Sequence, residues 1–142
     1  MEMLKLAVDI ATLLVLGIMS IVAIAYAFER IAFYKKVDVK KFETKNKAEA
    51  ALTENLATIT IIGSNAPYIG LLGTVGGIMV VFYEIGKSGG LDPSQVVIGL
   101  SLALKATALG LLVAIPSTMF YGACMRKVDL LMGQWEDAQG GK

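Results

Sequence analysis

The stretch Pro67-Tyr68-Ile69-Gly70-Leu71-Leu72-Gly73-Thr74-Val75-Gly76-Gly77 lies inside a run of 28 residues, 56–83, that carries no charged side chain. A helix that only anchors a protein in lipid needs bulky apolar residues, whereas glycines leave the backbone bare so that a second helix can approach closely. Gly70, Gly73 and Gly77 recur at helical spacing, and the hydroxyl of Thr74 falls on the same face. The run therefore predicts a membrane helix that packs tightly against another helix.

The composition of the 142-residue chain is that of a small membrane protein, with 56% hydrophobic and 18% charged residues. A formal net charge of +1, with no interleaving of basic and aromatic residues, argues against a nucleic-acid partner. The chain has no histidine and one cysteine, Cys124, so we expect no metal site, no cofactor and no intrachain disulfide. It also lacks a phosphate-binding loop and a serine near a base, so we expect no enzymatic activity.

A first apolar span, 10–28, precedes this run and holds 19 residues without a charge. As a helix it would be about 28 Å long, which is close to the hydrocarbon thickness of a bilayer. A cleaved signal peptide is the competing interpretation. Glu2 and Asp9 stand beside a single Lys5, however, and no small-residue cleavage site follows cleanly, so we expect the span to be retained as an anchor.

The second and third spans are longer than a bilayer requires. The run 56–83 would be about 42 Å long as one helix, and its first third is polar, so we start the lipid-crossing part near Pro67. The third span, 94–125, follows Asp92 and Pro93. Asp92 or Ser94 can cap a helix there, and Pro93 suits its first turn.

Positive charges predict the orientation of the spans. Seven basic residues lie between the first and second spans, and the tail adds Arg126, Lys127 and Lys142. Because Lys and Arg accumulate on the cytoplasmic side, the sequence predicts an all-α membrane protein with three transmembrane helices, its N-terminus outside and its C-terminus inside. Without proline or glycine after the first span, we expect helices that extend into the cytoplasm. The predicted single domain has crossings at 10–28, 67–86 and 94–125, a cytoplasmic helix at 29–66, an outer loop at 87–93 and a cytoplasmic tail at 126–142.

Two blocks carry a resemblance to a known family. The block Pro67-Tyr68-Ile69-Gly70-Leu71-Leu72-Gly73-Thr74-Val75-Gly76-Gly77-Ile78-Met79 resembles the conserved block of the MotA/TolQ/ExbB proton-channel family, and 103–116 resembles that family's third transmembrane helix. The order and spacing of the blocks agree, and the shape is closest to the ExbB group. The resemblance implies a pentameric homo-oligomeric ring in the inner membrane of Gram-negative bacteria, around the helices of an ExbD-like single-span partner. It also implies that proton flow energises a TonB-like protein, which opens outer-membrane transporters.

Small side chains form a stripe with one hydroxyl on each of the last two spans. The stripes are Gly70, Gly73, Thr74 and Gly77 on the second span and Ala103, Thr107, Gly110 and Ala114 on the third. Repeated around a ring, they would leave a lumen lined by threonine, so Thr74 and Thr107 are the candidate proton-pathway residues. The glycines, together with Pro67 and Pro116, form a helix-packing signature. The alternative is ordinary helix contact, in which each threonine bonds a carbonyl one turn back.

Two questions remain from the sequence: which group binds the proton, and where Lys105, the one charge of the third span, lies. A threonine holds no proton near neutral pH, and Asp9 and Glu84 read as interfacial residues, so the carboxylate is expected from a partner; the resemblance implies an essential aspartate on the ExbD-like helix. Lys105 departs from the family pattern, in which a glutamate commonly stands three positions earlier, where this chain has Leu102. Lys105 either faces the ring interior or a subunit junction at mid-bilayer, or it reaches water at the outer mouth of a lipid span at 106–125.

The preferred function is thus a motor subunit that uses the proton motive force for TonB-linked uptake. A TolQ-like subunit that maintains the envelope is the nearest alternative. A non-conducting membrane scaffold, in which the glycine faces only pack, is the alternative from another class.

Overall fold

The computed structural model describes residues 2–90 and 92–140, and all regular elements within them are helical. In chain order they are α1 (Glu2–Lys36), the 3-10 turn η1 (Val39–Lys41), α2 (Lys45–Leu52), α3 (Leu56–Ser88) and α4 (Pro93–Gly140). Lys142 of the predicted tail and residue 91 of the predicted outer loop lie outside the described residues, as does the side chain of Glu2.

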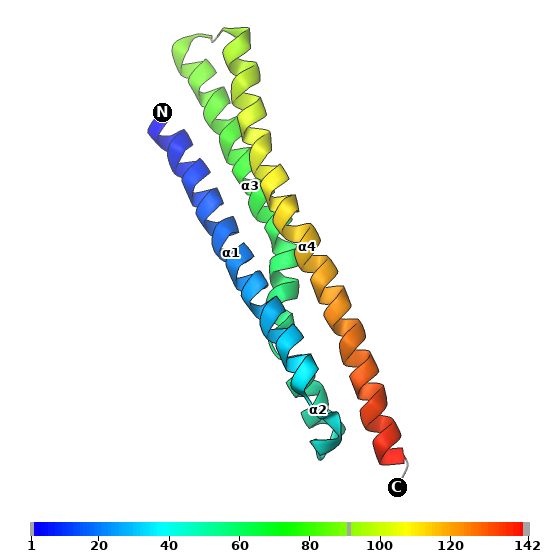
Figure 1. Cartoon of the computed structure of the whole chain (residues 1–142). Helices are drawn as coiled ribbons and strands as arrows, with labels where there is room; N and C mark the ends of the chain where they lie inside the picture. The colour runs from blue at the N-terminus through cyan, green and yellow to red at the C-terminus, as the bar shows by residue number, and fades with distance from the viewer. Residues whose placement is uncertain (1, 91, 141–142) are drawn as a thin grey trace.

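The long helices α1, α3 and α4 run side by side in one elongated bundle (Figure 1). The N-terminus and the turn between α3 and α4 lie toward one end of the bundle, while α2 and the C-terminus lie at the other. All three long helices are long and apolar enough to cross a membrane. This confirms the predicted all-α class with three membrane-capable helices.

The start of α4 is capped as the sequence predicts. The Asp92 carboxylate accepts a hydrogen bond from the backbone N–H of Ser94 at 3.3 Å, and Pro93 occupies the first helical position. The Asp92 carbonyl accepts from the N–H of Gln95 at 2.9 Å. From this cap the helix continues without a break to Gly140, so the described part of the predicted tail, 126–140, is an extension of the third span.

The single helix expected over 29–66 is wrong. The chain leaves the helix after Lys36, because the Asp38 side chain accepts from the N–H of Lys40 and the Thr44 hydroxyl accepts from the N–H of Lys47, starting new turns in new directions. Asn55 then takes a left-handed conformation, with φ at 69°, before α3 begins. These turns reverse the chain so that α3 can run antiparallel to α1, which one unbroken helix could not do.

An apolar cluster holds this reversal against α4. Its buried members are Tyr34, Val39, Leu52, Leu56, Ile59, Cys124, Val128 and Leu131. The indole N–H of Trp135 donates to the carbonyl of Phe42 at 3.0 Å, which ties the end of α4 to the linker before α2. The reversal and the helical tail therefore form one packed unit at the α2 end of the bundle.

Arg30 is the largest fully buried side chain of this unit. Its guanidinium donates to the last carbonyls of α2, those of Ala51 at 2.8 Å and Leu52 at 3.3 Å, and binds both carboxylate oxygens of Glu29 at 2.6 Å. The guanidinium also lies 4.3 Å from the ring centre of Phe33. Because a helix end leaves carbonyls without partners, Arg30 on α1 serves as the C-terminal cap of α2.

Candidate functional site

The glycine-rich faces of α3 and α4 meet each other within the chain. A Cβ atom added to Gly70 would lie 2.6 Å from the carbonyl oxygen of Ala106, and one added to Gly110 would lie 2.6 Å from the carbonyl oxygen of Ala66. Gly77 likewise has no room, because its Cβ would come within 2.8 Å of the Ala103 side chain. The two helices thus cross backbone against backbone, which glycine alone permits.

The small-residue stripes of α3 and α4 therefore pack against each other, and neither stripe is exposed along its whole length. The expectation that each stripe as a whole faces a lumen does not describe the single chain. Pro67 lies within α3 and is partly buried, whereas Pro116 lies within α4 and is exposed. A role for the threonines in a proton path stays a prediction.

The Thr74 hydroxyl bonds two backbone groups of α4. It donates to the Ala103 carbonyl at 2.8 Å and accepts from the backbone N–H of Thr107 at 3.2 Å. An α-helix normally pairs these two backbone groups with each other, since they are four residues apart. The Thr107 hydroxyl lies 2.5 Å from that of Thr74, so the two candidate residues form one hydrogen-bonded pair across the crossing.

The third helix reaches the same level of the bundle. A Cβ atom on Gly73 would lie 2.8 Å from the Thr12 hydroxyl of α1 and 2.8 Å from the Cβ of Ala106. The Thr12 hydroxyl donates to the Val8 carbonyl one turn back at 2.9 Å. Gly73 therefore contacts both Thr12 of α1 and Ala106 of α4, and Gly73 and Ala106 directly precede Thr74 and Thr107 in the chain.

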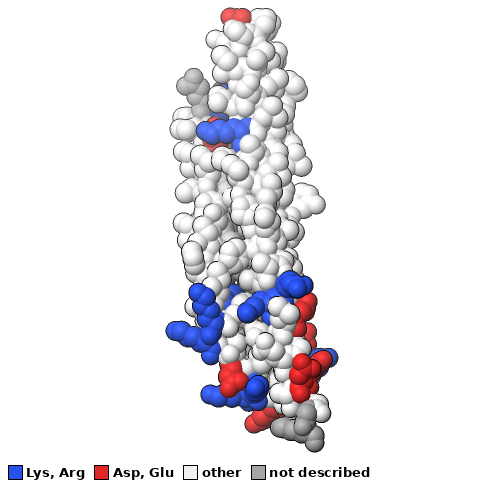
Figure 2. Space-filling model, turned by 45° about the vertical axis from the view of Figure 1, so that its right-hand side comes forward, with Lys and Arg blue, Asp and Glu red and all other residues white. Residues whose placement is uncertain are grey.

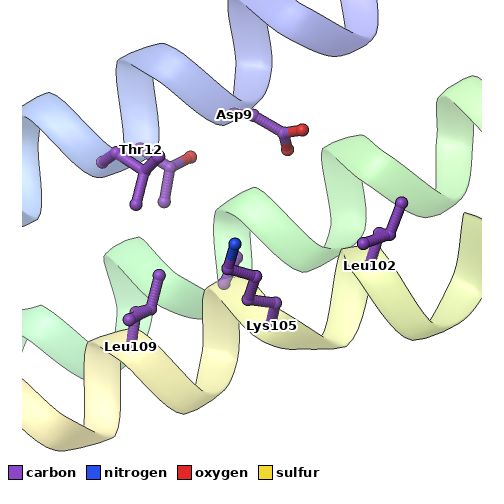
Figure 3. Close-up of a pocket in the computed structure, with 7 residues that line it drawn as sticks. Asp9, Thr12, Leu102, Lys105 and Leu109 are labelled. Carbon is purple, nitrogen blue, oxygen red and sulfur yellow. The ribbon is translucent and has the colours of Figure 1, made fainter.

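Lys105 faces a recess between α1 and α4 that also receives Asp9 (Figure 3). The recess has a volume of about 90 Å³ and is lined in addition by Thr12, Leu102 and Leu109. Asp9 was expected to be a simple interfacial residue, and Thr12 was missed. The spacing of Asp9 and Thr12 could have indicated that both line one site, because residues three apart share a helix face.

No group of three or more metal-ligating side chains comes together in residues 2–90 and 92–140. The polar chemistry of the site therefore rests on hydroxyls, backbone groups and the charges of Asp9 and Lys105. These groups can bind water and pass hydrogen bonds along, but the hydroxyls need a titratable partner to move a proton.

Known sequences now identify the family. The profile of the MotA/TolQ/ExbB proton channel family matches residues 35–137, which include α2, α3 and most of α4. The chain belongs to the MotA/TolQ/ExbB family. It is thus a channel subunit of membrane transport and a multi-pass membrane protein.

Two curated members of the MotA/TolQ/ExbB family match nearly the whole chain. The biopolymer transport protein ExbB of Helicobacter pylori J99 is 52% identical over 131 residues, covering 92% of this chain and 90% of its own length. That of Aquifex aeolicus is 45% identical over 140 residues, covering 99% and 95%. The Tol-Pal system protein TolQ of Pseudomonas aeruginosa is 34% identical over 90 residues, covering 63% of this chain and 39% of TolQ.

Proposed function

We propose that this chain is the proton-channel subunit of an ExbB–ExbD type complex in the inner membrane of a Gram-negative bacterium. The complex uses the proton motive force to energise a TonB-like protein and, through it, uptake across the outer membrane. Similarity to proteins named ExbB over more than nine-tenths of the chain supports the transport role over a TolQ-like one. The observation that carries the mechanism is the Thr74–Thr107 hydroxyl pair at the centre of the α3–α4 crossing.

The hydroxyl pair can order water and hydrogen bonds but cannot store a proton. With Thr74 donating to the Ala103 carbonyl, Thr107 donates to the Thr74 oxygen, and the direction of the pair reverses only when both hydroxyls rotate. An aspartate on the ExbD-like helix supplies the group that is protonated and released. A proton that crosses at about 150 mV yields roughly 3.5 kcal/mol from the membrane potential alone.

The surface charge supports an orientation with the α2 end in the cytoplasm. Figure 2 shows charged residues gathered over the lower end of the molecule, below a broad belt that is almost free of charge. In Figure 1 this is the end where α2 and the C-terminus lie. Because basic segments stay on the cytoplasmic side, the N-terminus and the turn between α3 and α4 face the periplasm.

Exposed apolar side chains support assembly into a homo-oligomeric ring, of which a pentamer is the expected form. Leu72 and Met79 on α3 and Leu104 and Leu112 on α4 are all exposed in the single chain. In a membrane protein such surfaces contact either lipid or neighbouring subunits. The ring would place α3 and α4 around the ExbD-like helices.

The test replaces both hydroxyls, Thr74→Ala with Thr107→Ala, in the complex with its ExbD-like partner. We expect the complex to assemble while proton uptake into proteoliposomes and energised iron uptake in cells are lost. Ser64→Ala is the matched control, because this exposed hydroxyl bonds only its own helix, at the Thr60 carbonyl. Full proton uptake by the assembled double variant would show that the two hydroxyls are not part of the proton path. No proton uptake by the unmodified complex would favour the non-conducting scaffold instead.

A deletion strain separates the ExbB role from the TolQ role. Poor growth on scarce iron with an intact envelope is expected for an ExbB-type subunit. Sensitivity to detergent with normal growth on scarce iron would assign the chain to the TolQ role.

A further inference from the structure

Two opposite charges line one recess between α1 and α4. Asp9 from α1 and Lys105 from α4 both line the recess of about 90 Å³, and Figure 3 shows the carboxylate and the ammonium on its two sides. They are not in direct contact, since the ion pairs within 4.0 Å in the described chain join other residues, all toward the α2 end. A recess of this size has room for a water molecule, which the Asp9 carboxylate, the Lys105 ammonium and the Thr12 hydroxyl can hold within an otherwise apolar lining.

Both charges stand at the edge of long uncharged stretches. On α1 the next charge after Asp9 is Glu29, 20 residues and about 30 Å along the helix. On α4 the next charge after Lys105 is Arg126, 21 residues and about 32 Å along the helix. A lone charge beside such a belt is costly, and a charge of opposite sign on the facing helix removes most of that cost.

The recess is also next to the hydroxyl pair. Thr12 and Ala106, which line it, both lie against Gly73, the residue before Thr74. Lys105 is two residues before Thr107 on α4. A positive charge left uncompensated here would repel a proton approaching the threonines.

We propose that Asp9 is the counter-ion of Lys105, and that this water-bridged pair holds α1 against α4 and keeps the Thr74–Thr107 crossing free of net positive charge. Asp9 is thus a positioning residue that acts through Lys105. The structural part of the proposal stands on the recess alone, whereas the effect on proton movement rests on the proposed channel function.

Lys5 is the competing partner of Asp9. It lies four residues before Asp9, on the same face of α1, and is half-buried. A variant series must therefore show which lysine the carboxylate compensates.

The experiment combines Asp9→Asn with Lys105→Met, and separately with Lys5→Met, in the full-length chain. The first readout is the melting temperature in detergent, which requires no transport. Asp9→Asn is expected to lower it, and adding Lys105→Met is expected to restore it, because the unpaired charge is then gone. Exchanging the charges, Asp9→Lys with Lys105→Asp, keeps a pair in place and is expected to preserve the fold if Asp9→Asn unfolds the chain.

The second readout is proton uptake into proteoliposomes by the complex with its ExbD-like partner. Asp9→Asn is expected to reduce uptake about tenfold, and Asp9→Asn with Lys105→Met is expected to recover it to within about threefold of the unmodified complex. Asp9→Asn with Lys5→Met should stay defective.

Additive loss of stability in Asp9→Asn with Lys105→Met, or rescue by Lys5→Met instead, would overturn the counter-ion proposal. If the melting temperatures show rescue by Lys105→Met but the unmodified complex takes up no protons, the proposed channel function fails and the counter-ion pair stands. If the unmodified complex conducts but no variant pair shows rescue, the channel function stands and the pair fails.

Discussion

Replacing Gly110 by alanine tests how closely α3 and α4 approach each other. The new Cβ atom would lie 2.6 Å from the Ala66 carbonyl oxygen and 3.0 Å from the Gly70 Cα. Ordinary van der Waals contact begins at 3.4 Å, so the helices must part by about 0.8 Å. Both obstacles are backbone atoms, which cannot turn away as a flexible side chain can.

The same movement reaches the hydroxyl pair. A separation of about 0.8 Å would stretch the 2.8 Å bond from Thr74 to the Ala103 carbonyl beyond the range of a hydrogen bond. Overpacking costs about 1–3 kcal/mol and the lost hydrogen bond about 1 kcal/mol, while alanine improves helix propensity by about 1 kcal/mol. We expect Gly110→Ala to lower the free energy of unfolding by about 1–3 kcal/mol.

Gly122 provides the matched control, because it lies on the same helix and a Cβ there would meet nothing within 4 Å. Gly122→Ala should therefore raise the free energy of unfolding by up to about 1 kcal/mol. Circular dichroism in mixed micelles measures helix loss, and the fluorescence of the single tryptophan reports the α2 end separately. Equal unfolding midpoints for Gly110→Ala and Gly122→Ala would refute the close crossing.

Three further changes probe the contacts that hold the bundle together. Thr74→Val should lower the free energy of unfolding by about 1–2 kcal/mol, since it removes the hydroxyl that bonds both the Thr107 N–H and the Ala103 carbonyl. Thr74→Ser keeps a hydroxyl and should lose much less stability, so equal losses in thermal melts would contradict these hydrogen bonds. Arg30→Met should lower the free energy of unfolding by on the order of 2–4 kcal/mol, because the last carbonyls of α2 lose their hydrogen-bond donors. Arg30→Lys should not recover this loss, since lysine lacks the forked guanidinium, and faster hydrogen exchange at 45–52 would show that α2 is destabilised in both variants. Trp135→Phe should cost about 1 kcal/mol for its one hydrogen bond and leave proton uptake unchanged; a loss of uptake would show that the tail does more than pack.

Several parts of the fold follow from local sequence. The membrane-capable helices are visible in the lengths of the apolar runs, and the start of α4 is visible in Asp92 and Pro93, because hydropathy and capping are properties of a few neighbouring residues. The reversal between α1 and α3 was missed although Asp38 and Thr44 carry the signal. A segment without proline or glycine can still leave the helix, because Asp and Thr side chains bond nearby backbone N–H groups and start new turns.

By itself the sequence determined the family, the number of membrane-capable helices and the residues whose small size allows a close crossing. The tertiary structure decided that Gly70 meets Gly110 and that Thr74 meets the backbone of α4. It also placed Asp9 and Lys105 at one recess. The physical reason is that helix periodicity fixes which side chains share a face, but the register and rotation of one helix against another depend on all the contacts along their length. Asp9 and Lys105 are 96 residues apart in the chain, and nothing local to either residue predicts the other.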